Sequence, residues 1–325
     1  MKILVTGAAG FIGMHLCKKL LDLGFEVIGL DNINSYYDVK LKKNRLKNLY
    51  NNNKQFQFYE IDILDNTKLT NIFNDNDFDY VVHLAAQAGV RYSIEKPRTY
   101  IDSNLIGFFN ILELCKSSDI KNFFYASSSS VYGLNENHPW KEDDMTDTPV
   151  ALYGATKKAN ELMASSYSHL YDINATGLRF FTVYGPWGRP DTSLFLFVDA
   201  IFNDKEIQLF NNGNMIRDFT YIDDVISSII KLIETDANKT DIKNSHQIFN
   251  IGTGNPIKLR DYIQVIESEI GKKAKIKNMP MQMGDIKVTS ADNEKLKKFI
   301  NYVPHTSVVD GIKNFVKWYK DYYES

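Results

Sequence analysis

Tyr153 and Lys157 stand four residues apart, and a run of four serines occupies positions 127–130 upstream of them. On a helix, this spacing places the phenol and the ammonium on one face. A neighbouring cation lowers the pKa of a phenol, so the phenolate can take a proton from a sugar hydroxyl while hydride leaves the carbon beneath it. These residue types therefore indicate redox chemistry at a carbinol carbon.

The Tyr-x-x-x-Lys spacing is common in this chain, because it occurs at Tyr36/Lys40, Tyr50/Lys54, Tyr92/Lys96 and Tyr153/Lys157. Only the last pair follows a predicted strand, residues 122–127, whose carboxyl end would present the serines. The other three lie in polar or uncertain segments and are interpreted as surface pairs. The serine hydroxyls can relay a proton or bind other substrate oxygens. The alternative is a polar strand end without a ligand.

Three glycines, Gly7, Gly10 and Gly13, follow a predicted strand at residues 2–6 and open a predicted helix at residues 13–23. Glycines there permit a tight turn, a close approach of backbone to a pyrophosphate and close packing of helix on strand. The helix N-terminus supplies N–H donors. The spacing differs by one residue from the commoner G-x-G-x-x-G. A dinucleotide site is predicted, and a turn without a ligand is the alternative.

Asp31 ends the second predicted strand, at the distance from the glycines where a carboxylate binds the adenosine ribose. Such a carboxylate repels a 2′-phosphate, so it predicts NAD rather than NADP. Asp62 follows the third strand and could reach the adenine amino group. An ordinary turn carboxylate is an equally good interpretation of Asp62.

Short β-rich runs alternate with helical patterns through the first half of the chain, which predicts a parallel sheet with helices on both faces. The fold class is α/β, a doubly wound Rossmann sheet with a smaller C-terminal α/β substrate lobe. The expected domains are residues 1–181, joined by about 218–252, and residues 182–325. Strands are expected at residues 2–6, 26–31, 56–61, 80–84, 122–127, 175–181 and 247–251, helices at 13–23, 102–117, 151–171 and 221–234, and a loop at 182–191.

The bulk composition narrows the class of protein. A net charge of -2 argues against nucleic acid as the main partner, and no apolar run is long enough to span a membrane. A cytoplasmic protein is expected, with Cys17 and Cys115 as buried free thiols. His83 is interpreted as a core histidine, because no second ligand shows metal spacing. The basic run at residues 40–47 is interpreted as a solvated helix face beside the cofactor cleft.

Several motifs together resemble one superfamily, the extended short-chain dehydrogenases/reductases, and within it the nucleotide-sugar 4-epimerases. They are MKILVTGAAGFIG, HLAAQAGVRYS, YASSSSVYG, YGATK, FFTVYGPWGRPD and RDFTYIDDV. Three segments are similar to the UDP-glucuronate 4-epimerase branch: DNINSYYDVKLKKNRL, AGVRYS and GPWGRPDTSLFLF. The resemblance runs from residue 1 to about residue 292.

The resemblance implies a mechanism in which NAD stays bound and is regenerated in each turnover. The Tyr153 phenolate takes the proton of the sugar 4-hydroxyl with Ser128 as the relay, and Lys157 also holds the nicotinamide ribose. Hydride leaves C4, the 4-keto sugar turns, and hydride returns to its other face. The family also implies an isomerase used in polysaccharide biosynthesis. It implies a homodimer that pairs through helices 102–117 and 151–171.

Ser130 stands where related dehydratases and decarboxylases carry an acidic residue, just before Val-Tyr-Gly. Elimination and decarboxylation need that second acid. Its absence favours simple epimerisation.

The resemblance also assigns binding residues by position. Against the cofactor it places Gly7, Gly10, Phe11, Ile12, Gly13, Asp31, Asn32, Asp62, Ile63, Leu84, Ala85, Ala86, Tyr153 and Lys157. Arg189 and Arg217 would clamp the UDP pyrophosphate, and Asp285 would contact the uridine ribose. Hydroxyls of Ser129, Ser130 and Thr182 could bind a carboxylate at C6, with Arg91 as an alternative partner. Phe210 could flank uracil, although core packing explains a single Phe equally well.

The predicted activity is NAD-dependent 4-epimerisation of UDP-glucuronate to UDP-galacturonate. Epimerisation of UDP-glucose or UDP-N-acetylglucosamine is the nearest alternative. A one-way dehydrogenase and a non-catalytic NAD-binding regulatory module are further alternatives. The presence of Ser128, Tyr153 and Lys157 together disfavours the regulatory module.

Overall fold

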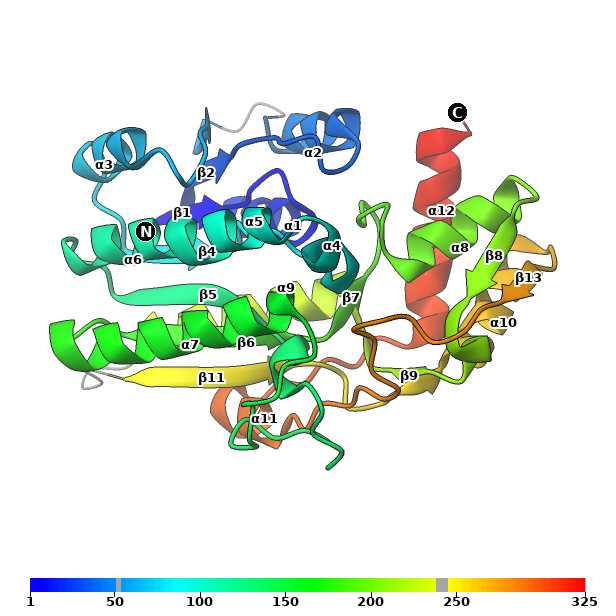
Figure 1. The fold of residues 1–325 in the computed structure, drawn as a ribbon. Helices are drawn as coiled ribbons and strands as arrows, with labels where there is room; N and C mark the ends of the chain where they lie inside the picture. The colour runs from blue at the N-terminus through cyan, green and yellow to red at the C-terminus, as the bar shows by residue number, and fades with distance from the viewer. Residues whose placement is uncertain (51–53, 238–244, 325) are drawn as a thin grey trace.

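The computed structural model describes residues 1–50, 54–237 and 245–324. Its central sheet has seven parallel strands in the order β11-β6-β5-β4-β1-β2-β3 (Figure 1). The chain enters the sheet at β1, builds outward to β3, and then crosses to β4 on the other side of β1. Ligands bind at such a reversal of strand order, outside the carboxyl ends of the strands. The strands are β1 (Lys2–Thr6), β2 (Glu26–Asp31), β3 (Phe56–Glu60), β4 (Tyr80–His83), β5 (Asn122–Ser128), β6 (Ala175–Phe180) and β11 (His246–Ile251).

The predicted fold class is confirmed, and the expected strands agree with the observed ones to within a residue at either end. β11 comes from far along the chain and pairs with β6 from His246 to Ile251. β11 forms the edge of the sheet next to β6. The sheet therefore includes a segment from the second half of the sequence.

Helices cover both faces of the sheet. Alternate residues of β1 divide between two cores, with Ile3 and Val5 in one and Leu4 in the other, as the two-residue period of a strand requires. The first core includes residues of α1 (Phe11–Asp22), α2 (Val39–Tyr50) and α9 (Ile222–Ala237). The second includes residues of α3 (Asn66–Asn74), α6 (Phe108–Lys116) and α7 (Leu152–Tyr171).

The helix expected at residues 102–117 is not a single α-helix. α4 (Val90–Glu95) and α5 (Pro97–Tyr100) precede a π-helix, η1 (Ile101–Gly107), which continues into α6. Gly107 packs tightly there, since a Cβ on it would lie 2.4 Å from Cδ1 of Ile63. A π-helical turn is uncommon and is often found at functional sites.

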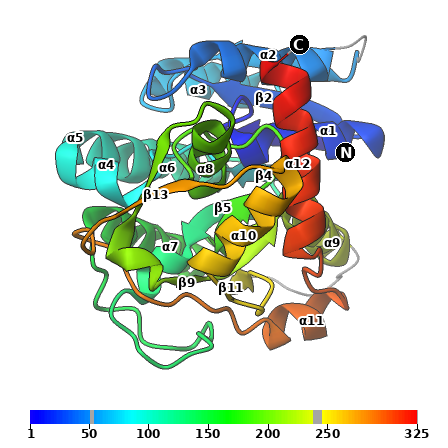
Figure 2. The ribbon, with the colours of Figure 1, turned by 90° about the vertical axis from the view of Figure 1, so that its right-hand side faces the viewer.

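The smaller lobe contains α8 (Ser193–Phe202), α10 (Leu259–Ile270) and α12 (Val308–Tyr323), grouped in Figure 2. Three two-stranded sheets accompany them: β8 (Glu206–Leu209) with β13 (Lys275–Asn278), β9 (Ile216–Arg217) with β12 (Ile257–Lys258), and β7 (Thr182–Tyr184) with β10 (Phe219–Tyr221). The remaining short helices are η2 (Ser129–Tyr132), η3 (Phe210–Gly213) and α11 (Glu294–Ile300).

The prediction of a loop over residues 182–191 is wrong for its first three residues, because they form β7, which pairs in parallel with β10. The glycines and prolines that suggested a loop come after Tyr184. The division of the chain into lobes at residue 181 stays a prediction. Within the described residues, no helix has the length and apolar character to cross a membrane.

Candidate active site

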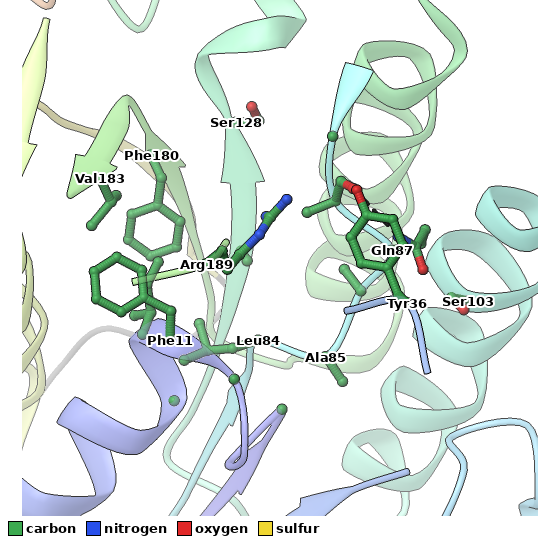
Figure 3. Close-up of a pocket in the computed structure, with 18 of the residues that line it drawn as sticks. Phe11, Tyr36, Leu84, Ala85, Gln87, Ser103, Ser128, Phe180, Val183 and Arg189 are labelled. Carbon is green, nitrogen blue, oxygen red and sulfur yellow. Dashed lines mark hydrogen bonds between the residues drawn. The ribbon is translucent and has the colours of Figure 1, made fainter. Parts of the chain in front are cut away.

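A cleft of about 400 Å³ lies at the carboxyl ends of the central strands. Residues at the ends of β1, β2, β4, β5 and β6 all contribute to its lining. Figure 3 shows Phe11, Phe180 and Val183 on one side of this cleft and Tyr36, Gln87 and Ser103 on the other. The reversal of strand order beside β1 therefore coincides with this cleft.

The glycine loop lines one end of the cleft with Gly7, Gly10, Phe11, Ile12 and Gly13. Gly7 has φ +74°, and a Cβ there would lie 2.8 Å from the backbone nitrogen of Ala85. A Cβ on Gly13 would lie 2.1 Å from the Gly7 carbonyl oxygen. Side chains at these positions are therefore excluded, and α1 begins directly at the cleft. Its N-terminal N–H groups suit a pyrophosphate, so the loop fits a dinucleotide.

Asp31 lies at the end of β2 in the same lining, with Asn32, Ile63, Leu84, Ala85 and Ala86. Its carboxylate accepts hydrogen bonds from the backbone N–H of Ile33 at 2.8 Å and of Ala9 at 3.2 Å. Burial raises the pKa of Asp31, and these hydrogen bonds oppose that shift. The side chain is thus fixed beside the glycine loop, where the ribose of a dinucleotide is expected.

Asp62 lies outside the lining of this cleft. Its carboxylate accepts hydrogen bonds from the Asn32 side chain at 2.7 Å and from the Leu64 N–H at 2.9 Å. These contacts match the alternative in which Asp62 is a turn carboxylate. Asp62 can influence the cleft through Asn32, which does line it.

Ser128, Tyr153 and Lys157 all line the cleft, on β5 and α7. Burial raises the pKa of Tyr153, while its hydrogen bond with Ser128 and the charge of Arg189 lower it. The Ser128 oxygen accepts a hydrogen bond from the Ser130 N–H at 3.1 Å, which leaves its own hydroxyl proton free to be donated. The phenol and the serine are therefore placed to exchange a proton.

The role of Lys157 as a cation that lowers the pKa of Tyr153 stays a prediction, and in the structure the charge of Arg189 favours the phenolate. The Lys157 ammonium donates a hydrogen bond to the Ala126 carbonyl at 2.8 Å. Burial lowers the pKa of Lys157 to about 7. The two side chains share a helix face, yet the ammonium is directed to the neighbouring strand.

Asn104 is a supporting residue that the sequence reasoning missed. It lies in η1, and its side chain accepts from the Gln87 N–H at 2.8 Å and donates to the Gln87 carbonyl at 3.0 Å. The same amide donates to the Thr156 hydroxyl at 3.0 Å, one residue before Lys157. Asn104 thus ties the segment after β4 to α7. No spacing rule in the sequence indicated this contact.

A second, smaller hollow of about 180 Å³ adjoins the cleft and shares Val90, Ser129, Ser130 and Thr182 with it. Arg217 and Asp285 also line this hollow, and their charged atoms are 3.9 Å apart. Residues assigned to the sugar and to the uridine therefore meet in one place. They come from η2, β7, β9 and the segment after β13.

Arg189 lines the main cleft rather than the smaller hollow. It extends between Phe180 and Tyr36 in Figure 3. Its guanidinium pairs with Asp191 through Nε at 3.0 Å and through Nη2. The Tyr36 hydroxyl donates to the same carboxylate at 2.9 Å. Arg189 and Arg217 therefore stand in adjacent cavities.

Arg91 and Phe210 line neither cavity. The Arg91 guanidinium is exposed and lies over the Phe210 ring, 4.9 Å from its centroid. The two side chains contact each other, and their assignment to substrate binding stays a prediction.

Two interpretations of the segment after β2 are wrong. Tyr36 is not a fully exposed surface residue, because it is half-buried, lines the cleft and has its ring centroid 4.6 Å from that of Tyr92. The basic run at residues 40–47 is not wholly solvated, since Lys42 is 5% and Arg45 is 0% exposed. Hydropathy could not reveal the burial of Arg45, because its guanidinium contacts Trp187 and Gly188, which are distant in the sequence.

The prediction that Cys17, Cys115 and His83 are core residues is confirmed. Cys17 and Cys115 are free and buried. His83 is buried and pairs with the Thr6 hydroxyl at 2.8 Å. In the described part of the chain, no group of His, Cys, Asp or Glu side chains could hold a metal ion.

Comparisons with known proteins agree with this geometry. The chain matches the NAD dependent epimerase/dehydratase family over residues 3–252. It is 49% identical to Protein CapI of Staphylococcus aureus, with 100% of both chains covered. It is 44% identical to the UDP-glucuronate 4-epimerase of Thermodesulfobacterium geofontis, covering 98% of this chain and 96% of that one.

Among solved structures, the UDP-glucuronic acid 4-epimerase of Bacillus cereus, in complex with UDP-glucuronic acid and NAD, superposes with a TM-score of 0.92. It is 36% identical and covers 99% of this chain and 100% of its own. Both the extent of the family match and the full-length relatives lead to the same conclusion: the chain belongs to the NAD dependent epimerase/dehydratase family.

Proposed function

We propose that this protein catalyses NAD-dependent 4-epimerisation of UDP-glucuronate to UDP-galacturonate. The observation that carries the proposal is the junction of two cavities. Ser128 and Tyr153 line the first, and Ser129, Ser130 and Thr182 line both. A sugar at this junction would present one carbon to the phenol and another to the neighbouring hydroxyls. The proteins from Thermodesulfobacterium geofontis and Bacillus cereus named above are UDP-glucuronate 4-epimerases, which supports the same substrate.

The proton chemistry is assigned to Tyr153. Its phenolate accepts the proton of the 4-hydroxyl, directly or through Ser128, and returns it after the sugar has turned. Lys157 holds the ribose of the dinucleotide while its ammonium stays on the Ala126 carbonyl. Arg189 favours the phenolate by its charge. When bound, NAD⁺ supplies a reversible hydride acceptor for C4.

The pocket chemistry favours an acidic sugar that is not decarboxylated. Ser129, Ser130 and Thr182 can each donate a hydroxyl hydrogen bond to a C6 carboxylate. Arg217 and Asp285 stand beside them for the diphosphate and the uridine ribose. Ser130 takes the position where an acid would be needed for a second proton transfer, so the reaction ends with inversion at C4.

The test compares turnover of UDP-glucuronate, UDP-glucose and UDP-N-acetylglucosamine by the purified enzyme. UDP-glucuronate should be converted with the highest kcat/KM, and a higher value for either neutral sugar would contradict the proposed substrate. Tyr153→Phe should lower kcat by a factor of about 10²–10⁴ while the protein still binds NAD. Steady accumulation of NADH would instead indicate a one-way dehydrogenase.

We also infer a cytoplasmic homodimer. The helices expected to pair, η1 with α6 and α7, contact each other. They expose apolar side chains that a monomer would leave in water: Ile106, Phe109, Leu162, Leu170 and Tyr171. A second copy packed on these helices would bury them. The two reduced thiols are consistent with the cytoplasm.

A further inference from the structure

Arg45 in α2 is a buried cation that forms no salt bridge with the described residues, although the Asp31 carboxylate is near enough to feel its charge. Its guanidinium donates to three carbonyl oxygens and one phenol, and no carboxylate among the described residues forms an ion pair with it. Burying a charge costs free energy even when its hydrogen bonds are satisfied. An arginine is therefore a poor choice here for stability alone, and the groups that it binds indicate another role.

Those groups belong to segments that are far apart in the sequence. Nε and Nη2 donate to the Trp187 carbonyl at 3.1 and 2.7 Å, and Nη2 also donates to the Gly188 carbonyl at 3.1 Å. Nη1 donates to the Ala9 carbonyl at 3.1 Å and to the Tyr37 hydroxyl at 2.6 Å. Ala9 lies inside the glycine loop, so one side chain joins that loop to the turn after β7.

The turn that Arg45 holds has a strained backbone. Trp187 has φ +61°, a left-handed conformation that is unfavourable for a residue other than glycine. The Gly188 N–H donates to the Gly185 carbonyl at 3.1 Å to close the turn, and the Trp187 ring packs against Trp318. Such a conformation persists only when its surroundings hold it. The planar guanidinium of Arg45 holds this turn by donating hydrogen bonds to two successive carbonyls.

Arg189 follows this turn directly and enters the cleft. Its guanidinium is held on one side by the Asp191 carboxylate, which also accepts a hydrogen bond from the Tyr36 hydroxyl. We propose that Arg45 is a positioning residue: by holding the Trp187 and Gly188 carbonyls, it sets where the Arg189 guanidinium stands relative to the anionic UDP-sugar. The identity of that ligand rests on the proposed function, whereas the contacts that position Arg189 do not.

The test is a double-mutant cycle on the nucleotide-loaded enzyme, with Arg45→Lys, Arg189→Lys and the double variant. Calorimetry measures the affinity for UDP-glucuronate. Lysine keeps the charge but loses the fork, so Arg45→Lys should weaken binding about tenfold. In the Arg189→Lys background the same change should weaken binding less than about twofold, because the positioned guanidinium is gone.

Arg260→Lys is the matched control. Arg260 also directs Nε and Nη2 at one carbonyl, that of Asn212, at 3.1 and 2.6 Å, but on the exposed surface of the smaller lobe. This variant should leave the affinity unchanged. Equal weakening by Arg45→Lys in both backgrounds would overturn the proposal. A loss of affinity that is matched by a loss of folded protein in urea titrations would also overturn it. Either outcome would indicate that Arg45 has only a general structural role.

Turnover is measured separately so that the two proposals can fail independently. A wild-type enzyme that binds UDP-glucuronate without epimerising it would contradict the proposed function. The double-mutant cycle could still be interpreted, because it measures affinity and not turnover. A wild-type enzyme that prefers a neutral UDP-sugar contradicts the proposed substrate. The affinities in the double-mutant cycle are then measured with that UDP-sugar, which carries the same diphosphate.

Discussion

The Ser127 hydroxyl donates a 2.6 Å hydrogen bond to Oε1 of Glu161, which joins the strand of serines to the helix of Tyr153 and Lys157. Arg179 completes the arrangement with two hydrogen bonds to the same carboxylate, at 2.8 and 2.9 Å. Both charged side chains are 2% exposed. β5, β6 and α7 are thus held together directly beneath the proposed reaction centre.

Replacing one member of this buried pair should be costly. Glu161→Gln leaves the Arg179 charge without a counter-charge, so the free energy of unfolding should fall by about 3–5 kcal/mol. Urea titration measures this loss. Adding Arg179→Met to Glu161→Gln should recover part of it, because the unpaired charge is removed.

The exposed pair Arg98–Asp102 provides the control for that experiment. Its arginine side chain is 80% exposed, and Arg98→Met should cost no more than about 0.5 kcal/mol. If Glu161→Gln costs as little as Arg98→Met, the buried pair does not hold these elements together.

Lys157 should make stability depend on pH in the nucleotide-free protein. Burial lowers its pKa from 10.5 to about 7, so the unfolded chain holds this proton up to a higher pH than the folded chain does. The burial cost is therefore full below about pH 7, and the free energy of unfolding rises between pH 7 and 10.5. Lys157→Met should be about 2 kcal/mol more stable than wild type at pH 7, after the lost hydrogen bond to Ala126 is allowed for.

Urea titrations at pH 7, 8, 9 and 10 follow this difference, which should shrink steadily towards pH 10. Lys298→Met, at an exposed position of α11, is the control. A constant difference between wild type and Lys157→Met across the series would contradict the assigned effect of burial.

Asp31 should determine the choice between NAD and NADP. Asp31→Ser removes the charge that repels a 2′-phosphate, while Lys42 in the same lining remains to attract it. The preference for NAD, measured as the ratio of the two dissociation constants, should fall by about 100-fold. Asp62→Ser should leave this ratio unchanged, since Asp62 lies outside the cleft. An unaltered ratio in Asp31→Ser would show that another group discriminates.

The apolar surface of η1, α6 and α7 should hold the dimer together. Leu162 is 58% exposed in the single chain, and Leu162→Arg would place a charge in the paired surface. Sedimentation should show a wild-type dimer and a monomeric variant. Val309→Arg, at a 50% exposed position of α12, should leave the dimer intact. A wild-type monomer would contradict the inferred assembly.

Local sequence patterns were sufficient to predict the fold class and part of the candidate site. Gly7, Gly10 and Gly13 act through backbone sterics within one turn, and Asp31 acts at the end of its own strand, so short segments suffice to predict them. The same holds for the parallel strands, whose apolar runs are local. The start of β7 was missed because its partner, β10, lies far along the chain and the glycines after Tyr184 dominate the local signal.

The sequence by itself determined the class of chemistry, because Tyr153, Lys157 and the serines keep their types and spacing in any packing. Only the tertiary structure showed that the Lys157 ammonium donates to the Ala126 carbonyl and that a second cation, Arg189, favours the phenolate by its charge. It also decided that Arg45 is buried. Long polar side chains reach partners that are distant in the sequence, and which partner they reach depends on how whole elements pack.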